Sequence, residues 1–88
     1  MRYRVALTPR AERQFENLPA HVRKRVARWL DLLAIDPRRA GTKKLEGPGD
    51  LRRVHAGKDY VIVYVVREQE VLVLVVRVAH RREVYRGL

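Results

Sequence analysis

The chain has 88 residues, with 20 Lys and Arg against 10 Asp and Glu, so its formal net charge is +10. Its length predicts one domain over residues 1–88, and its 47% hydrophobic content excludes a disordered basic tail. The lack of cysteine excludes disulfides, zinc–thiolate sites and a cysteine nucleophile. No apolar run approaches the roughly 20 residues of a membrane span, and residues 1–10 lack a secretory core. These features predict a cytoplasmic protein with an acidic partner.

The first half of the chain predicts a strand followed by a helical hairpin. Residues 1–8 alternate apolar and polar side chains, as in a strand. Thr8-Pro9 is typical of a helix start, because the hydroxyl caps free N–H groups and proline suits the first helical position. Pro19 separates this helix from a second one with an apolar stripe, which ends at Asp36-Pro37.

The second half predicts a loop and three strands. Glycine and proline gather in residues 37–50, which we expect to be loop, and strands follow over 51–56, 60–66 and 71–78. The last two are apolar on both faces, which favours a central antiparallel hairpin covered on both sides for part of its length. The fold class is therefore α+β, in the order β-α-α-β-β-β. The helical hairpin packs on one face of a mainly antiparallel sheet, and a basic C-terminal tail spans residues 80–88.

Metal and cofactor chemistry finds no support in the sequence. The histidines His21, His55 and His80 show no metal-ligand spacing, and the ten acidic residues are scattered. There is no glycine-rich phosphate loop. We therefore predict no metal, no cofactor and no pair of catalytic carboxylates.

The basic residues of the second half gather on strands that we expect to be neighbours. Alternation places Arg53 and His55 on one face and Arg52 on the other. Two interpretations stay open here: a phosphate-binding surface, or a solvated sheet edge whose charges prevent edge pairing. The chemistry that fits the first is metal-free RNA cleavage by the 2′-OH, with arginine stabilising charge and histidine or tyrosine moving protons.

Several short motifs follow one another along nearly the whole chain, namely Leu7-Thr8-Pro9-Arg10-Ala11-Glu12, Lys43-Lys44-Leu45-Glu46-Gly47, Leu51-Arg52-Arg53-Val54, Asp59-Tyr60 and His80-Arg81-Arg82-Glu83-Val84-Tyr85-Arg86. Their order and spacing resemble the RelE/ParE superfamily of bacterial toxin–antitoxin toxins, in particular its RelE-like branch. The resemblance implies a ribosome-dependent endoribonuclease that cleaves mRNA in the A site and inhibits translation. It also implies an acidic antitoxin that neutralises the toxin.

The resemblance also assigns roles to residues. It implies a catalytic set made of Arg53, His55, Arg81 and Tyr85. It further implies an RNA-binding set made of Lys43, Lys44, Arg52, Lys58, Arg82 and Arg86.

One position departs from the family pattern. The family commonly carries arginine after Asp-Tyr on the strand that follows the turn, whereas this chain carries Val61. The loss of one such donor predicts a barrier higher by roughly 3–4 kcal/mol, unless Arg53, Arg82 or Lys58 compensates. Two alternatives remain open: a ParE-like toxin that inhibits gyrase without nuclease chemistry, and a catalytically silent relative that binds RNA or antitoxin.

Overall fold

The computed structural model describes residues 2–88. Five strands form one sheet in the order β1-β5-β4-β3-β2, in which only the β1–β5 pair is parallel. In chain order the elements are β1 (Arg4–Leu7), α1 (Pro9–Glu16), α2 (Ala20–Ile35), β2 (Thr42–Lys44), β3 (Asp50–His55), β4 (Tyr60–Arg67), the 3-10 turn η1 (Glu68–Glu70) and β5 (Leu72–His80).

Local sequence signals set the boundaries of both helices. The Thr8 hydroxyl accepts a hydrogen bond of 3.2 Å from the backbone N–H of Ala11, and Pro9 occupies the first position of α1. Pro19 directly precedes α2. The predicted helical hairpin is therefore confirmed. No helix within residues 2–88 is long and apolar enough to cross a bilayer.

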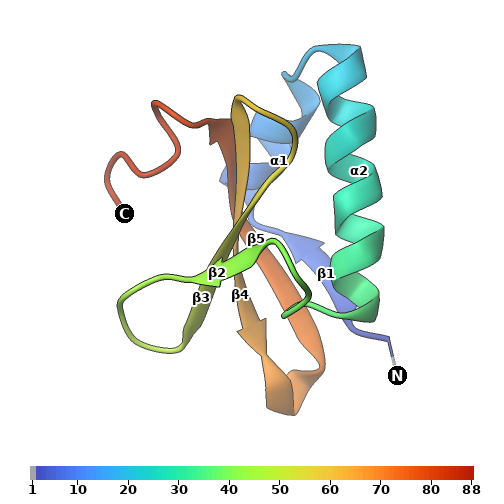
Figure 1. The fold of residues 1–88 in the computed structure, drawn as a ribbon, viewed down its shortest axis with the longest axis vertical. Helices are drawn as coiled ribbons and strands as arrows, with labels where there is room; N and C mark the ends of the chain where they lie inside the picture. Colours follow the sequence, from blue (N-terminus) through green and yellow to red (C-terminus); the bar gives the residue numbers. More distant parts are fainter. Residues whose placement is uncertain (1) are drawn as a thin grey trace.

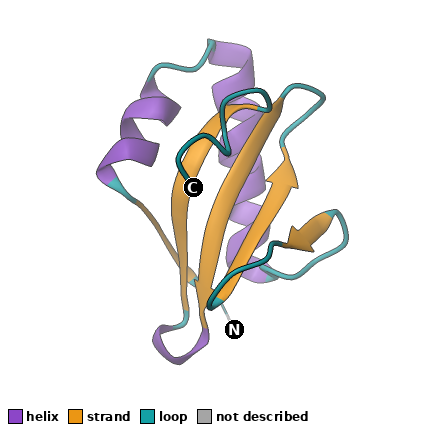
Figure 2. Ribbon diagram, turned by 90° about the vertical axis from the view of Figure 1, so that its left-hand side faces the viewer, coloured by secondary structure: helices purple, strands orange, loops and turns teal. Residues whose placement is uncertain are grey.

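The two faces of the sheet are covered differently. Both helices lie on one face, where they bury the main core, which includes Val22, Val26 and Leu33 of α2 and Val54, Ile62, Tyr64, Val73 and Val75 of the sheet. The opposite surface is called here the helix-free face. It carries a second, small cluster in which Val84 packs on Val61 and Val63. Val84 belongs to residues 81–88, which follow β5 and are called the C-terminal segment. Figure 1 shows the sheet between α2 and this segment, and Figure 2 shows the segment in front of the strands. The prediction that the central strands are covered on both sides is confirmed.

The α+β class and the helices on one face are confirmed, whereas one part of the loop prediction is wrong. Residues 42–44, expected to be loop, form the edge strand β2, which pairs antiparallel with β3. This strand is three residues long and has no apolar alternation, so its pairing with β3 creates it. The first strand is also shorter than predicted, over Arg4–Leu7, and Met1 of the predicted range lies outside the described residues.

Candidate functional site

The helix-free face carries a row of positive charge that crosses four strands. Lys43 of β2 is the register partner of Arg53, Arg53 of Val63, and Val63 of Arg77. Partners in adjacent strands point to the same face and lie about 4.8 Å apart. The three cations Lys43, Arg53 and Arg77, named here the cationic row, therefore span roughly 14 Å of sheet.

Within residues 2–88, no member of the cationic row forms an ion pair with a carboxylate. Lys43 directly opposes Arg53, an arrangement of like charges that destabilises a sheet. An anion placed over the row would remove this repulsion. The accessible end of the row, formed by Lys43 and Arg53, is therefore chemically suited to phosphate.

A β-bulge directs Arg77 toward this face. Residues two apart on a regular strand share a face, so Val75 and Arg77 would both face the helices. The register shifts where β5 passes Val63 and Tyr64, so that Val75 partners Tyr64 while Arg77 partners Val63. Arg77 therefore lies on the helix-free face. Its side chain is covered, and burial together with the positive charge of Arg10 lowers the pKa of its guanidinium.

The C-terminal segment folds onto the helix-free face as a series of turns. The carbonyl of His80 accepts hydrogen bonds from the N–H groups of Glu83 (2.8 Å) and Val84 (3.0 Å), and its Nδ1 accepts one from the Arg82 N–H (3.2 Å). Val84 is fully buried, whereas the Tyr85 side chain beside it is 43% exposed. Val84 is therefore the apolar anchor of this segment, and the Tyr85 ring stays accessible.

The other two predicted catalytic residues are His55 on β3 and Arg81 at the start of the C-terminal segment. His55 is exposed on the rung next to the cationic row, where its partner is Val61. The Arg81 backbone N–H donates to the carbonyl of Asp59 (2.7 Å), and Arg81 Nε lies 3.9 Å from Asp59 Oδ1. Arg81 therefore lies beside the β3–β4 turn, which also carries the exposed Lys58.

Val61 lies at a closed part of the face. It is completely buried and packs in the cluster with Val84. An arginine there would displace the C-terminal segment from its seat. The nearby buried cation is instead Arg77, one rung away on β5.

The predicted RNA-binding residues Lys44 and Arg52 lie apart from the cationic row. They partner each other and Tyr64 on the helix-covered face. There Arg52 Nε donates to Asp50 Oδ1 at 3.0 Å, and Asp50 Oδ2 accepts from Arg38 Nε at 2.9 Å.

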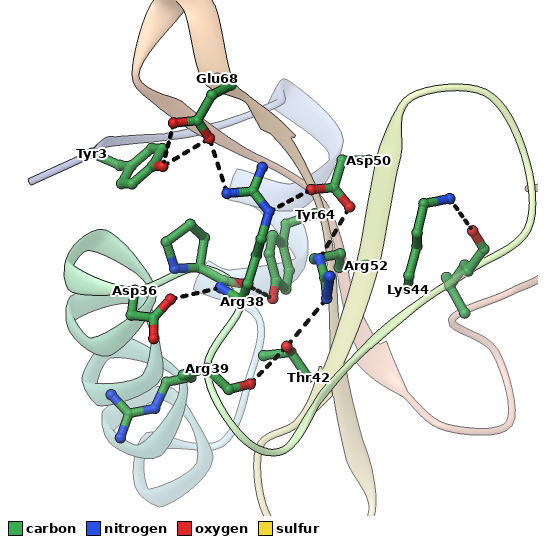
Figure 3. A network of polar contacts seen from close by, with 12 residues as sticks. Tyr3, Asp36, Arg38, Arg39, Thr42, Lys44, Asp50, Arg52, Tyr64 and Glu68 are labelled. Atoms are coloured by element: carbon green, nitrogen blue, oxygen red, sulfur yellow. Dashed lines mark hydrogen bonds and ion pairs between the residues drawn. The ribbon is translucent and has the colours of Figure 1, made fainter.

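These contacts belong to a larger polar network, shown in Figure 3. Arg38 Nη1 also donates to Glu68 Oε1 at 2.9 Å, and the Tyr3 hydroxyl donates to Glu68 Oε2 at 2.7 Å. Donation by Tyr3 and by Arg38 lowers the pKa of the Glu68 carboxyl. The network joins the start of the chain, the segment after α2, β3 and the β4–β5 connection, so Arg52 has a structural role.

Two residues of the site were absent from the predicted sets. Arg77 enters the face only because of the bulge, which strand alternation does not reveal. His80 stabilises the turn at the end of β5 through its ring nitrogen. Across the described part of the chain, no three His, Asp or Glu side chains gather at a metal-binding distance.

The sequence of this chain matches a known family, and its fold matches those of known proteins. A family model described as the ParE toxin of type II toxin–antitoxin system, parDE, matches residues 5–85. No curated protein matches the sequence.

Among solved structures, the archaeal RelE–RelB complex from Pyrococcus horikoshii OT3 is similar, with 28% identity, a TM-score of 0.81, and coverage of 94% of this chain and 99% of that chain. The isolated E. coli RelE toxin has 26% identity and a TM-score of 0.79, over 89% of this chain and 83% of that chain. The intact E. coli RelBE toxin–antitoxin complex has 28% identity and a TM-score of 0.77, over 88% and 94%.

Proposed function

This chain belongs to the ParE toxin family of type II toxin–antitoxin systems, within the RelE-like branch of the RelE/ParE superfamily, and we propose that it cleaves mRNA on the ribosome. The observation that carries the proposal is the cationic row, which has no acidic partner within residues 2–88 and lies on the face that also holds the exposed Tyr85. Such a surface binds a phosphate backbone without reading its sequence. Cleavage would take place in the cytoplasm, on translating ribosomes.

In the proposed reaction the RNA supplies its own nucleophile. The 2′-oxygen forms a bond to the adjacent phosphorus, its proton passes to the His55 imidazole, and the bond from phosphorus to the 5′-oxygen breaks. The leaving 5′-oxygen takes a proton from the Tyr85 phenol, which solvent later restores. The guanidinium groups of Arg53 and Arg81 stabilise the extra negative charge on the phosphoryl oxygens. The products are a 2′,3′-cyclic phosphate and a 5′-hydroxyl.

The proposed contacts to the rest of the RNA come from exposed basic residues around this centre. They are Lys43, Lys58, Arg82 and Arg86. Arg52 is not among them, because it pairs with Asp50 on the helix-covered face, whereas the exposed Lys44 could reach RNA only from the opposite side of β2 to Lys43.

We also propose an acidic antitoxin as the partner that neutralises this chain. Similar folds occur in RelE–RelB and RelBE complexes, the latter described as a toxin–antitoxin complex. The net charge of +10 would attract an acidic segment and speed its association. The accessible members of the cationic row, Lys43 and Arg53, would then bind antitoxin carboxylates in place of phosphates.

Primer extension on mRNA translated in the presence of the protein tests the nuclease proposal. The wild type is expected to produce new 3′ ends within codons only when ribosomes are present. Arg53→Ala is expected to lower the cleavage rate roughly 100- to 1,000-fold, the usual effect of removing one charge-stabilising donor. Arg67→Ala is the matched control, because Arg67 is an exposed arginine on β4 that pairs with Glu70 (3.4 Å).

The alternative is gyrase inhibition, which the buried Val61 favours because the site lacks the family's arginine at that position. A DNA supercoiling assay run on the same preparations separates the two functions. Inhibited supercoiling without new mRNA ends would overturn the nuclease proposal and support the alternative. If the protein neither cleaves mRNA nor inhibits supercoiling, the result supports a catalytically silent relative that binds RNA or antitoxin.

A further inference from the structure

Arg77 is the one buried charged residue within residues 2–88, with 7% of its surface exposed. It also ion-pairs with no carboxylate of the described chain. A buried cation without a counter-charge is costly unless its N–H groups are hydrogen-bonded. The acceptors that Arg77 uses therefore indicate what it is there to hold.

Both acceptors are backbone carbonyls of the C-terminal segment, on either side of Tyr85. Arg77 Nη1 donates to the carbonyl of Val84 at 3.3 Å and also to the carbonyl of Arg86. Gly87 has a φ of 76°, a left-handed conformation that glycine adopts freely, and it turns the chain past the Arg77 guanidinium. The segment therefore curls around one guanidinium group, with Tyr85 at the centre of the curl.

We propose that Arg77 is a positioning residue that fixes Tyr85 beside the cationic row. This inference rests on the proposed nuclease function, in which Tyr85 contacts the RNA. Two attachments hold the segment: the Val84 side chain in the cluster with Val61 and Val63, and the Arg77 bridge to the two carbonyls. With the backbone held on both sides, the Tyr85 ring projects from a fixed base while remaining 43% exposed.

Arg77 acts through Tyr85, since its guanidinium is covered by the segment that it holds. A direct contact with RNA would require that cover to leave. Arginine suits the role better than lysine, because its planar fork presents several donors in fixed directions. The β-bulge supplies the remaining requirement, because it turns Arg77 away from the core and under the segment.

A double-mutant cycle measured by single-turnover cleavage of ribosome-bound mRNA tests the proposal. Arg77→Met is expected to lower the cleavage rate about 10- to 100-fold, on the scale of a misplaced reacting group, with little change in ribosome binding. In a Tyr85→Ala background the same substitution is expected to cost nothing further. Arg77→Lys keeps a charged donor and should recover part of the rate. Arg67→Met is the control for loss of one arginine elsewhere on the sheet.

A second measurement separates this proposal from the nuclease function. The ¹⁵N heteronuclear NOE values of residues 82–87 are expected to fall toward those of a mobile terminus in Arg77→Met and to stay high in Arg67→Met. This readout needs no activity, so it holds even if the wild type does not cleave RNA. If Arg77→Met does not fold, Arg77→Lys carries a weaker form of the test, with NOE values expected between those of the wild type and those of a mobile terminus, because one charged donor remains. NOE values unchanged from the wild type in a folded Arg77 variant, or additive losses in the cycle, would overturn the proposal.

Discussion

Two lysine–arginine pairs stand side by side on the β2–β3 ladder, and they have different surroundings. Lys43 opposes Arg53 on the helix-free face, and Lys44 opposes Arg52 on the helix-covered face. Arg52 has Asp50 at 3.0 Å, and that carboxylate also binds Arg38. Among residues 2–88, Arg53 has no such partner.

Charge alone does not identify a binding residue in this sheet. The two arginines are neighbours in sequence, and both are half-buried. One has its charge offset by a neighbouring carboxylate and ties β3 to the segment after α2. The other keeps its charge available, at a cost in repulsion that only an anionic partner removes. Whether an arginine of this sheet stabilises the fold or stays available to a ligand depends on which face of the sheet it occupies and on whether a carboxylate lies beside it.

The largest expected effect on stability comes from a substitution of Tyr64, which is the register partner of Arg52 on the helix-covered face. Its hydroxyl donates to the carbonyl of Pro37 at 2.6 Å in the interior. Tyr64→Phe leaves that carbonyl without its partner and is expected to cost about 1–3 kcal/mol of unfolding free energy, measured by urea denaturation. The cleavage rate should stay unchanged, because Tyr64 faces away from the cationic row. A loss below half a kcal/mol would show that the rung is not structural.

Tyr64 also gives a prediction about alkaline pH. Burial raises the pKa of the Tyr64 phenol to about 12, above the unfolded value near 10. A group whose pKa is higher in the folded state contributes its full stabilisation at pH values below its unfolded-state pKa. This contribution is lost as pH rises through its folded-state pKa. The difference in unfolding free energy between wild type and Tyr64→Phe should therefore shrink as pH rises above about 10. A constant difference over that range would contradict this prediction.

The second-largest effect on stability is expected from removing the Asp50 carboxylate, which distinguishes the Lys44–Arg52 pair from the Lys43–Arg53 pair. Asp50→Asn removes the only charge partner that Arg52 has within residues 2–88, so the Lys44–Arg52 pair comes to resemble the Lys43–Arg53 pair, whereas Arg38 keeps Glu68. Asp50 is partly buried, so the expected cost lies between that of a surface pair and that of a buried pair, about 1–2 kcal/mol. Asp31→Asn, an exposed change of the same type on α2, should have almost no effect on thermal or urea unfolding. Equal costs for the two variants would remove the contrast between the faces.

The smallest expected effect has the opposite sign. Lys43→Glu converts the repulsive pair with Arg53 into an attractive one, and is expected to raise the unfolding free energy by about 0.2–1 kcal/mol. Ribosome-dependent cleavage should fall at the same time, because the new carboxylate repels phosphate. Lys44→Glu should stabilise less, since Arg52 already pairs with Asp50. If Lys43→Glu lowers stability, then Arg53 is already neutralised and the cationic row carries no stored repulsion.

Local signals predicted most of the fold. The Thr8-Pro9 cap, the apolar stripe of α2 and the two apolar strands are short-range patterns, and each formed the expected element. Alternation also placed Arg52 and Arg53 on opposite faces, as the ladder shows. The strand β2 was missed because three polar residues form a strand only through pairing with β3.

The candidate site was less predictable, because two of its features depend on tertiary structure. The bulge that redirects Arg77 comes from how β4 and β5 align, and no residue of that run marks it in the sequence. The seat of Val84 on Val61 and Val63 depends on the return of the C-terminal segment across the sheet. The burial of Val61 therefore could not be predicted from the sequence.

The parallel pairing of β1 with β5 has a consequence for the order in which the protein is made. Arg4 pairs with Leu72, and Thr8 Oγ1 donates to the carbonyl of Val76, 68 positions further along the chain. The sheet joins its earliest strand to its latest one, so loop-closure entropy is spent before these contacts form. A nascent chain that still lacks β5 has no strand to join β1 to β4, and it also lacks Arg77. Its cationic row is completed only after β5 has been translated.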